Sequence, residues 1–160
     1  MKLALITNPT KDTGLMTAAR AAKLLYGRAE LYMSDNCSIP EVGYLPYEEL
    51  FKTVDAAIVI GGDGTLLRVA TQCAKNSIPA LGINLGKVGF LTEVEPSGME
   101  AAFEKLINGE YIKEQRMLLR ICVNDENVSY HALNDVVVSK TEGARLISMD
   151  LYTDGELVNH

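Results

Sequence analysis

The stretch VDAAIVIGGDGT, residues Val54–Thr65, decides the fold. Its first part, Val54–Ile60, is apolar on both faces toward its end, as a central strand of a parallel sheet must be. The strand ends at Gly61–Gly64, and Thr65–Lys75 is expected to be a helix with Thr65 or Asp63 as its N-cap. A strand that passes through a glycine turn into a helix indicates a βαβ unit.

The same alternation extends on either side of this stretch. Apolar runs predict strands at Leu3–Thr7, Ala29–Met33 and Ile78–Ile83, and helical spacing predicts helices at Thr13–Tyr26, Tyr47–Lys52 and Met99–Ile107. Ser34–Pro46 contains two prolines and is expected to be a loop. Residues 1–96 are therefore predicted to form an α/β domain with a Rossmann-like parallel sheet.

The pattern changes after Glu95–Gly98, which we interpret as a domain boundary. Leu118–Val123, Val128–Val138 and Leu146–Leu151 are β-rich runs, and Thr153–Gly155 is a hairpin turn signal. So few strands without a covering helix leave a sheet with a bare face and open edges. Residues 97–160 are thus expected to be the start of an antiparallel β domain that is incomplete.

Composition narrows the class of protein. Of 160 residues, 48% are hydrophobic and 22% charged, which is typical of a folded domain. The net charge of −6 argues against binding to duplex nucleic acid or to a membrane surface. The three cysteines Cys37, Cys73 and Cys122 are scattered, which argues against a disulfide framework or a zinc site. With no signal peptide and no membrane-spanning run, we expect a cytoplasmic protein.

Gly61–Thr65 is the strongest candidate for chemistry. Glycines let the backbone approach phosphate groups closely, and the carboxyl end of a parallel strand is where ligands bind. A carboxylate among such amides repels phosphate unless it serves as a base or binds a metal, so Asp63 suggests phosphoryl transfer to a hydroxyl group. The alternative is a tight turn in which Asp63 only caps the helix. The segment matches neither a Walker A loop nor GxGxxG.

Two further segments hold candidate ligand contacts. Asn84, after the next strand, could bind a ligand through its amide, and Phe90 could stack on a base or plug the core. Asn134 and Asp135 interrupt the predicted strand Ala132–Val138 and need polar partners, which a ribose or a sheet edge would supply. Two cations, Arg68 and Arg145, could neutralise phosphates or be surface charges.

Three segments together resemble the NAD kinase family: Gly61–Thr65, Asn84–Thr92 and Leu133–Asp135. The first alone also occurs in lipid kinases of the diacylglycerol kinase type, and the other two narrow the resemblance. It implies transfer of the γ-phosphate of ATP to the 2′-hydroxyl of the adenosine ribose of NAD. A divalent cation, by preference Mg²⁺, would assist.

The resemblance also assigns roles. Asp63 matches the proton acceptor, and no residue is expected to be a metal ligand of its own. The expected nucleotide contacts are Gly61, Gly62, Asp63, Gly64, Thr65, Arg68, Asn84, Phe90, Asn134, Asp135 and Arg145. Family members continue into a Thr-Pro-Thr-Gly-Ser-Thr-Ala-Tyr motif that is absent here, so we expect this chain to fold at least over residues 1–95 and to be inactive alone.

Two other functions stay open at this point. A lipid kinase of the diacylglycerol kinase type shares the glycine motif, and a non-catalytic nucleotide-binding or assembly fragment would use the open sheet edges. For the kinase we expect small nucleotides as partners, no nucleic acid and no membrane, and a homo-oligomer, either a dimer or a tetramer.

Overall fold

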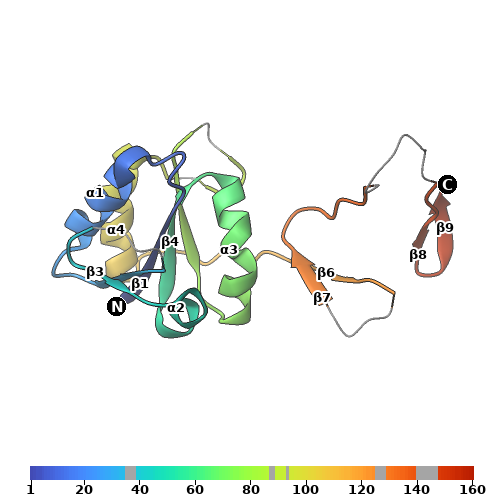
Figure 1. The fold of residues 1–160 in the computed structure, drawn as a ribbon, viewed down its shortest axis with the longest axis horizontal. Helices are drawn as coiled ribbons and strands as arrows, with labels where there is room; N and C mark the ends of the chain where they lie inside the picture. Colours follow the sequence, from blue (N-terminus) through green and yellow to red (C-terminus); the bar gives the residue numbers. More distant parts are fainter. Residues whose placement is uncertain (35–38, 87–88, 93, 125–128, 140–147) are drawn as a thin grey trace.

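A computed structural model of the chain describes residues 1–34, 39–86, 89–92, 94–124, 129–139 and 148–160. The strands are β1 Lys2–Thr7, β2 Glu30–Met33, β3 Val42–Tyr44, β4 Ala56–Gly61, β5 Ala80–Asn84, β6 Leu119–Cys122, β7 Ser129–Ala132, β8 Leu151–Thr153 and β9 Glu156–Asn159. The α-helices are α1 Met16–Leu25, α2 Tyr47–Thr53, α3 Asp63–Lys75 and α4 Met99–Asn108. Short 3₁₀ turns, Thr13–Leu15 and Pro96–Gly98, lead into α1 and α4 (Figure 1).

Five parallel strands form one sheet in the order β3-β2-β1-β4-β5. The strands β6 and β7 form an antiparallel pair, and β8 and β9 form another. The chain therefore has the α/β class predicted from its sequence, with small antiparallel sheets after the parallel one. Among the described residues, no helix is both long and apolar enough to cross a membrane.

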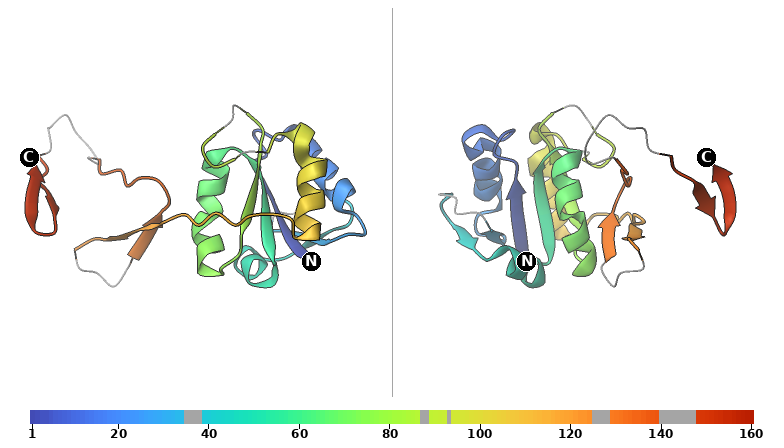
Figure 2. Two further views of the ribbon diagram at one scale, coloured as in Figure 1. Left: turned by 180° about the vertical axis from the view of Figure 1, so that it is seen from behind. Right: turned by 45° about the vertical axis from the view of Figure 1, so that its right-hand side comes forward.

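Helices cover both faces of the parallel sheet, because alternate residues of its central strands point to opposite sides (Figures 1 and 2). On one face, Leu3 and Leu5 of β1 pack in a core with α1 and α4. On the other, Ala4 packs in a second core with α2 and α3. Burial on both faces explains why Ala56–Gly61 is buried throughout and apolar in sequence.

The predicted elements are found with four corrections. The run expected as a strand at Leu146–Leu151 begins outside the described residues, and within its described part only Leu151 belongs to a strand, β8. The stretch expected to be a loop holds β3, which pairs with β2 from Leu31↔Val42 onward. The N-cap of α3 is Gly62, in an extended conformation, and not Asp63 or Thr65. The long strand expected to end at Val138 ends at Ala132 as β7, since no described strand pairs with the residues that follow.

The helix α4 bears on the domain boundary expected at residue 96. Its buried residues Met99, Phe103 and Leu106 lie in the same core as β1 and α1. The helix ends at Gly109, whose φ of 74° is in the left-handed region that glycine adopts readily. We therefore propose that the α/β unit extends to residue 109.

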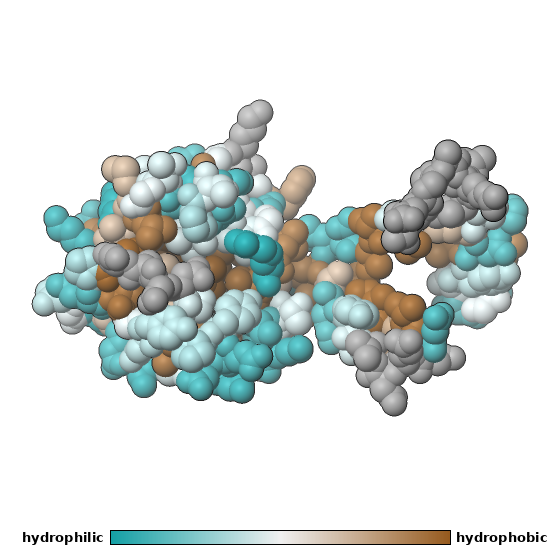
Figure 3. Space-filling view, in the orientation of Figure 1, coloured by the Kyte–Doolittle hydropathy of each residue, from teal (hydrophilic) through white to brown (hydrophobic). Residues whose placement is uncertain are grey.

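The two hairpins extend away from the α/β unit (Figure 2). The turn between β8 and β9 has positive φ at Asp154 (49°) and Gly155 (86°), which is the geometry of a tight hairpin turn. Exposed hydrophobic residues of the hairpins and their connections include Tyr130, Val136, Val137, Val138, Leu151, Tyr152, Leu157 and Val158. Figure 3 shows this hydrophobic surface to the right of the α/β unit.

Candidate functional site

The site lies where the order in which the chain adds strands to the sheet reverses. The chain moves outward from β1 to β2 and β3, and β4 then adds on the other side of β1. In open α/β sheets, ligands bind at such a switch point, at the carboxyl ends of the strands. Here those ends carry the Asn8–Lys11 turn after β1, and Gly61 and Gly62 at the end of β4.

Two glycines are required by close packing at this edge. A Cβ on Gly61 would lie 2.2 Å from Oγ1 of the buried Thr65. A Cβ on Gly89 would lie 2.3 Å from Oδ1 of Asp63. Both distances are shorter than real side chains allow, so these positions accept only glycine without a shift of their neighbours. Thr65 thus supports the loop from inside.

The Asp63 carboxylate holds the loop after β5. Its Oδ2 accepts the N–H of Phe90 at 2.8 Å. Its Oδ1 accepts the N–H groups of Leu91 at 3.2 Å and Thr92 at 3.1 Å, and the Thr92 hydroxyl at 3.0 Å. The side chain that could have capped its own helix therefore joins two neighbouring loops, which accounts for the shift of the N-cap to Gly62.

These contacts shift the acidity of Asp63. Partial removal from water raises its pKa, and the N–H groups of Phe90, Leu91 and Thr92 with the Thr92 hydroxyl lower it by a larger total. The net pKa is below the ordinary aspartate value, because every donor favours the charged form. Asp63 is therefore ionised at neutral pH and can accept a proton, although a lowered pKa makes it a weaker base.

Asn84 lies next to the same loop at the end of β5. It is 3% exposed, and its Oδ1 accepts the N–H of Gly86 at 3.0 Å. A Cβ on Gly62 would lie 3.9 Å from this oxygen. The structure thus brings Gly62, Asp63 and Asn84 to one edge of the sheet.

Phe90 does not plug the core. Its side chain is 91% exposed, although its backbone N–H is bound to Asp63. The core-filling alternative from the sequence is therefore wrong, because the Asp63 carboxylate holds this part of the chain at the surface. The ring is accessible for stacking on a ligand.

Among the described residues, none of the other expected contacts forms a hydrogen bond or ion pair with this loop. Asn134 and Asp135 are exposed beyond the end of β7. Arg68 is exposed on α3, near Tyr47. Burial raises the pKa of Tyr47, the Cys73 thiol adds to this rise, and the Arg68 charge opposes it. Arg145 lies outside the described residues.

Sequence reasoning missed Lys11. A Cβ on Gly62 would lie 3.0 Å from Lys11 Nζ, so this ammonium group lies against the glycine loop. The sequence feature that could have indicated Lys11 is its position in the turn after β1, the strand that pairs with the central strand β4. A single lysine in a turn is too common a feature to be selected without the strand order.

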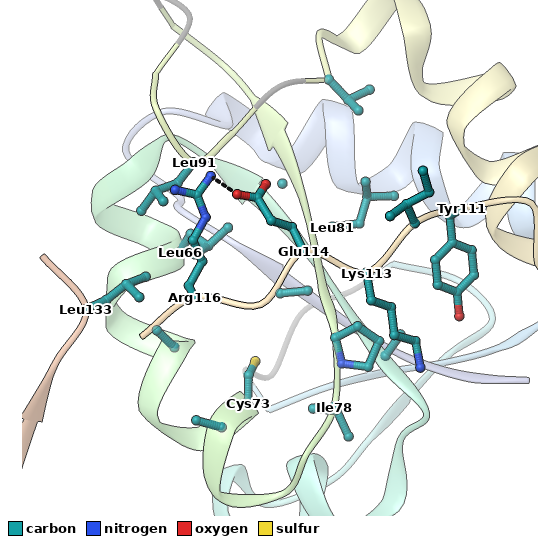
Figure 4. A pocket seen from close by; sticks show the side chains of 18 of the residues that line it. Leu66, Cys73, Ile78, Leu81, Leu91, Tyr111, Lys113, Glu114, Arg116 and Leu133 are labelled. Atoms are coloured by element: carbon teal, nitrogen blue, oxygen red, sulfur yellow. Dashed lines mark ion pairs between the residues drawn. The ribbon is translucent and has the colours of Figure 1, made fainter. Parts of the chain in front are cut away.

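A separate cavity of about 410 Å³ lies between α3, β5 and the segment that follows α4 (Figure 4). Leu66 and Leu91 line one end, beside the Asp63 loop, and Cys73 and Ile78 line the other. Burial raises the pKa of the Cys73 thiol to about 11. We assign the chemistry to the strand ends and not to this cavity, because its lining is mainly aliphatic.

No group of three or more His, Cys, Asp or Glu side chains that could hold a metal ion occurs in the described part of the chain. Asp63, the acidic side chain of the glycine loop, is occupied by the N–H and O–H groups of residues 90–92. The described residues therefore supply no cage for a cation of their own.

Comparison with known proteins identifies the family. Residues 46–111 match the family described as the ATP-NAD kinase N-terminal domain. An NAD kinase from Heliobacterium modesticaldum is 39% identical over 96% of this chain and 56% of its own length. An NAD kinase from Lachnoclostridium phytofermentans is 35% identical over 99% of this chain and 58% of its own. The chain thus spans little more than half the length of these relatives.

A solved structure supports the fold. Yeast NADH kinase, crystallised with NADH, superposes with a TM-score of 0.61 over 82% of this chain and 46% of its own, at 16% identity. At that identity the similarity concerns the fold alone. The family match covers α2, β4, α3, β5 and α4, and both relatives extend the similarity over nearly all of the chain. The lipid-kinase alternative is not favoured, and the chain belongs to the NAD kinase family, of which it represents the N-terminal portion.

Proposed function

We propose that the protein containing this chain is an NAD kinase that transfers the γ-phosphate of ATP to the 2′-hydroxyl of the adenosine ribose of NAD. The observation that carries this proposal is the Asp63 carboxylate, set between two glycine-rich loops at the switch point of the sheet. A poor nucleophile such as a ribose hydroxyl needs a base within hydrogen-bond reach.

The two oxygens of Asp63 are not equivalent. Oδ1 accepts three hydrogen bonds, from Leu91 and Thr92, whereas Oδ2 accepts one, from Phe90, among the residues that the structure describes. An ionised carboxylate has about four acceptor sites on its two oxygens. Oδ2 is thus the atom with room for a ribose hydroxyl, and Oδ1 anchors the loop. The carboxylate orients the hydroxyl and takes its proton as the bond to phosphorus forms.

The remaining contacts are assigned by their chemistry. Gly61, Gly62 and Gly64 permit close approach of phosphates, and Phe90 offers an exposed ring for a base. Asn84 positions the neighbouring loop. In this proposal Asn134, Asp135, Arg68 and Arg145 reach the nucleotide from the β part and from α3.

A divalent cation would be held mainly by phosphate oxygens of the substrate, since the described residues offer no cage. Mg²⁺ suits this arrangement, because it usually keeps water and binds through substrate phosphates. The cation would offset the repulsion between those phosphates and Asp63. We also place the protein in the cytoplasm, where scattered thiols stay reduced, and expect a dimer or tetramer.

The test measures NADP formation from NAD and Mg-ATP. Residues 1–160 are joined to the remaining part of the Heliobacterium modesticaldum relative, whose intact enzyme is the positive control. We expect NADP from the chimera, and much less from residues 1–160 alone because Asn134 and Asp135 are not held at the site. Failure of a folded chimera that binds neither NAD nor ATP would rule out the proposal.

The role of Asp63 is tested in the same chimera. Asp63→Asn is expected to lower kcat by about 10²–10⁴, the usual contribution of a general base. Thr92→Val is the matched control, because it removes one hydrogen bond to Oδ1 and leaves the carboxylate in place. If both variants lose activity equally, Asp63 acts by holding the loop and not as the base.

A further inference from the structure

We propose that Lys11 binds the phosphate groups of the nucleotide, an inference that rests on the proposed function and adds a residue to its site. Neither the glycine motif nor the other expected contacts include this side chain. It comes from the turn after β1, a different strand from the one that carries Asp63.

The position of the ammonium group is the first argument. Lys11 Nζ lies 3.0 Å from where a Cβ of Gly62 would stand, and Asn84 Oδ1 lies 3.9 Å from the same point. The ends of β1, β4 and β5, three neighbouring strands of the sheet, therefore meet at Gly62. The gap between β1 and β4 is the switch point of the sheet, so Lys11 stands where a ligand is expected on topology alone.

The turn that carries Lys11 is well fixed. The N–H of Asn8 bonds to the carbonyl of Ile60 in β4 at 3.1 Å, and the N–H of Lys11 bonds to the carbonyl of Asn8 at 2.9 Å. The Asn8 side chain accepts the N–H and the hydroxyl of Thr10, at 3.1 and 2.7 Å. Lys11 thus projects from a turn that is hydrogen-bonded directly to β4, the strand that leads into the glycine loop.

The charge of Lys11 is available. Its side chain is exposed, and the ion pairs formed by described residues are Arg28–Glu104, Arg116–Glu114 and His160–Asp150, none of which includes it. The carboxylate of the proposed base, Asp63, accepts its hydrogen bonds from residues 90–92 and forms no ion pair among the described residues. In a chain of net charge −6, a cation over bare glycine backbone supplies the local positive charge that an anionic ligand needs.

The chemistry favours a polyphosphate. Lysine binds phosphate as a compact point charge with three rotatable donors, and it needs no planar partner as arginine does. Gly62 beside it lets phosphate oxygens reach the backbone as well. The same chemistry is present in the triphosphate of ATP and in the diphosphate of NAD, and the experiment separates these two sources.

The experiment titrates residues 1–160 with ATP, inorganic tripolyphosphate, NAD and AMP by calorimetry, each without metal and with Mg²⁺. The variants are Lys11→Met, which keeps length and removes charge, and Lys11→Arg, which restores charge. Lys23→Met is the matched control. Lys23 is exposed in the last turn of α1, which returns the chain toward the opposite edge of the sheet.

We expect Lys11→Met to lower the affinity for ATP and for tripolyphosphate at least tenfold, the usual loss for one charge-assisted hydrogen bond. The affinity for AMP should change less than threefold. Lys11→Arg should recover most of the lost affinity for ATP and tripolyphosphate, and Lys23→Met should have the same affinities as the wild type. A loss confined to NAD would support the inference with the dinucleotide as the source.

Equal affinities of wild type and Lys11→Met for all four ligands would overturn the inference, and so would an equal loss in Lys23→Met. A wild-type chain that binds neither ATP, tripolyphosphate nor NAD would overturn it too. NADP formation by the chimera reports on the proposed function separately. If the chimera forms NADP and Lys11→Met does not change its activity, the phosphate-binding role of Lys11 is refuted and the proposed kinase function is retained.

Discussion

At the scale of single residues, Asp63 joins two loops that are distant in sequence. Its carboxylate receives four donors from residues 90–92, and Gly89 lies directly against it. The motif that was interpreted as a phosphate-binding loop therefore also holds residues 90–92 in place through Asp63. Because one side chain has both tasks, substitutions around it must separate loop position from chemistry.

Gly89→Ala tests the close contact. A Cβ there would meet both Asp63 oxygens, so the hydrogen bonds to the loop must lengthen or break. We expect the free energy of unfolding in urea to fall by about 1–2 kcal/mol, as for other overpacked sites. Gly64→Ala is the control, since a Cβ there meets nothing within 4 Å and alanine favours helix. Equal stability of Gly89→Ala and wild type would contradict the contact.

The lowered pKa of Asp63 makes stability depend on pH. A group whose pKa is lower in the folded state stabilises that state above its ordinary pKa, here 3.8, and loses the effect as pH falls through its folded pKa. The urea midpoint of wild type should exceed that of Asp63→Asn at pH 7 and 5, and approach it at pH 3. Asp154→Asn, which keeps the hairpin turn, is the control. A gap independent of pH would show that ionisation of Asp63 does not contribute.

At the scale of elements, α1 depends on a cap from outside the helix. The buried Asp12 accepts the N–H groups of Thr17 at 2.8 Å and Ala18 at 3.0 Å, and the Thr7 hydroxyl at 3.0 Å. The residue at the N-cap itself, Leu15, has a φ of 55° and makes no cap through its side chain. The turn that positions Lys11 therefore also starts the helix.

Asp12→Ala is expected to lower the free energy of unfolding by about 1–3 kcal/mol, because two helix amides and one hydroxyl lose a buried acceptor. Asp12→Asn, which keeps one oxygen, should lose less. Urea unfolding followed by circular dichroism gives both values, with the exposed Glu110→Ala as the control. A loss in Asp12→Ala no larger than in Glu110→Ala would exclude the capping role.

At the scale of the whole molecule, the chain has a packed part and an extended part. In the part of the chain that the structure describes, the buried hydrophobic residues lie between Leu3 and Leu106, whereas the residues of β8 and β9 are exposed throughout (Figure 3). The difference follows from how fully each sheet is covered by helices. Helices pack on both faces of the parallel sheet, whereas no described helix follows α4 and the hairpins stay mostly exposed, although β7 contacts α3.

Limited trypsin digestion should show this division. We expect early cleavage after Lys113 and Arg116, which are exposed outside any helix or strand, and a resistant fragment that begins at residue 1. Sites within α3, Arg68 and Lys75, should be cut much later, since cleavage there requires unfolding of the packed part. Mass spectrometry of the products over time identifies the cuts. Cleavage within α3 as fast as at Lys113 would contradict the proposed boundary at residue 109.

Local patterns predicted much of this fold. The apolar run of β4 and the glycines that follow predicted a central strand and a loop–helix junction, since a strand that is buried on both faces must be apolar throughout. Helical spacing predicted α1 and α4, and in the structure each helix is followed by a glycine with positive φ, Gly27 and Gly109. The short edge strand β3 escaped notice, because three residues with one half-buried side chain carry little pattern.

The sequence by itself determined the class of fold, the glycine motif and the candidate base, because strand burial, turn geometry and charge are properties of neighbouring residues. Tertiary structure alone decided that Asp63 holds Phe90 and Thr92, that Phe90 faces solvent, and that Lys11 meets Gly62. Those contacts join strand ends far apart in the chain, and the order of strands in the sheet, which no local pattern encodes, sets which ends are neighbours.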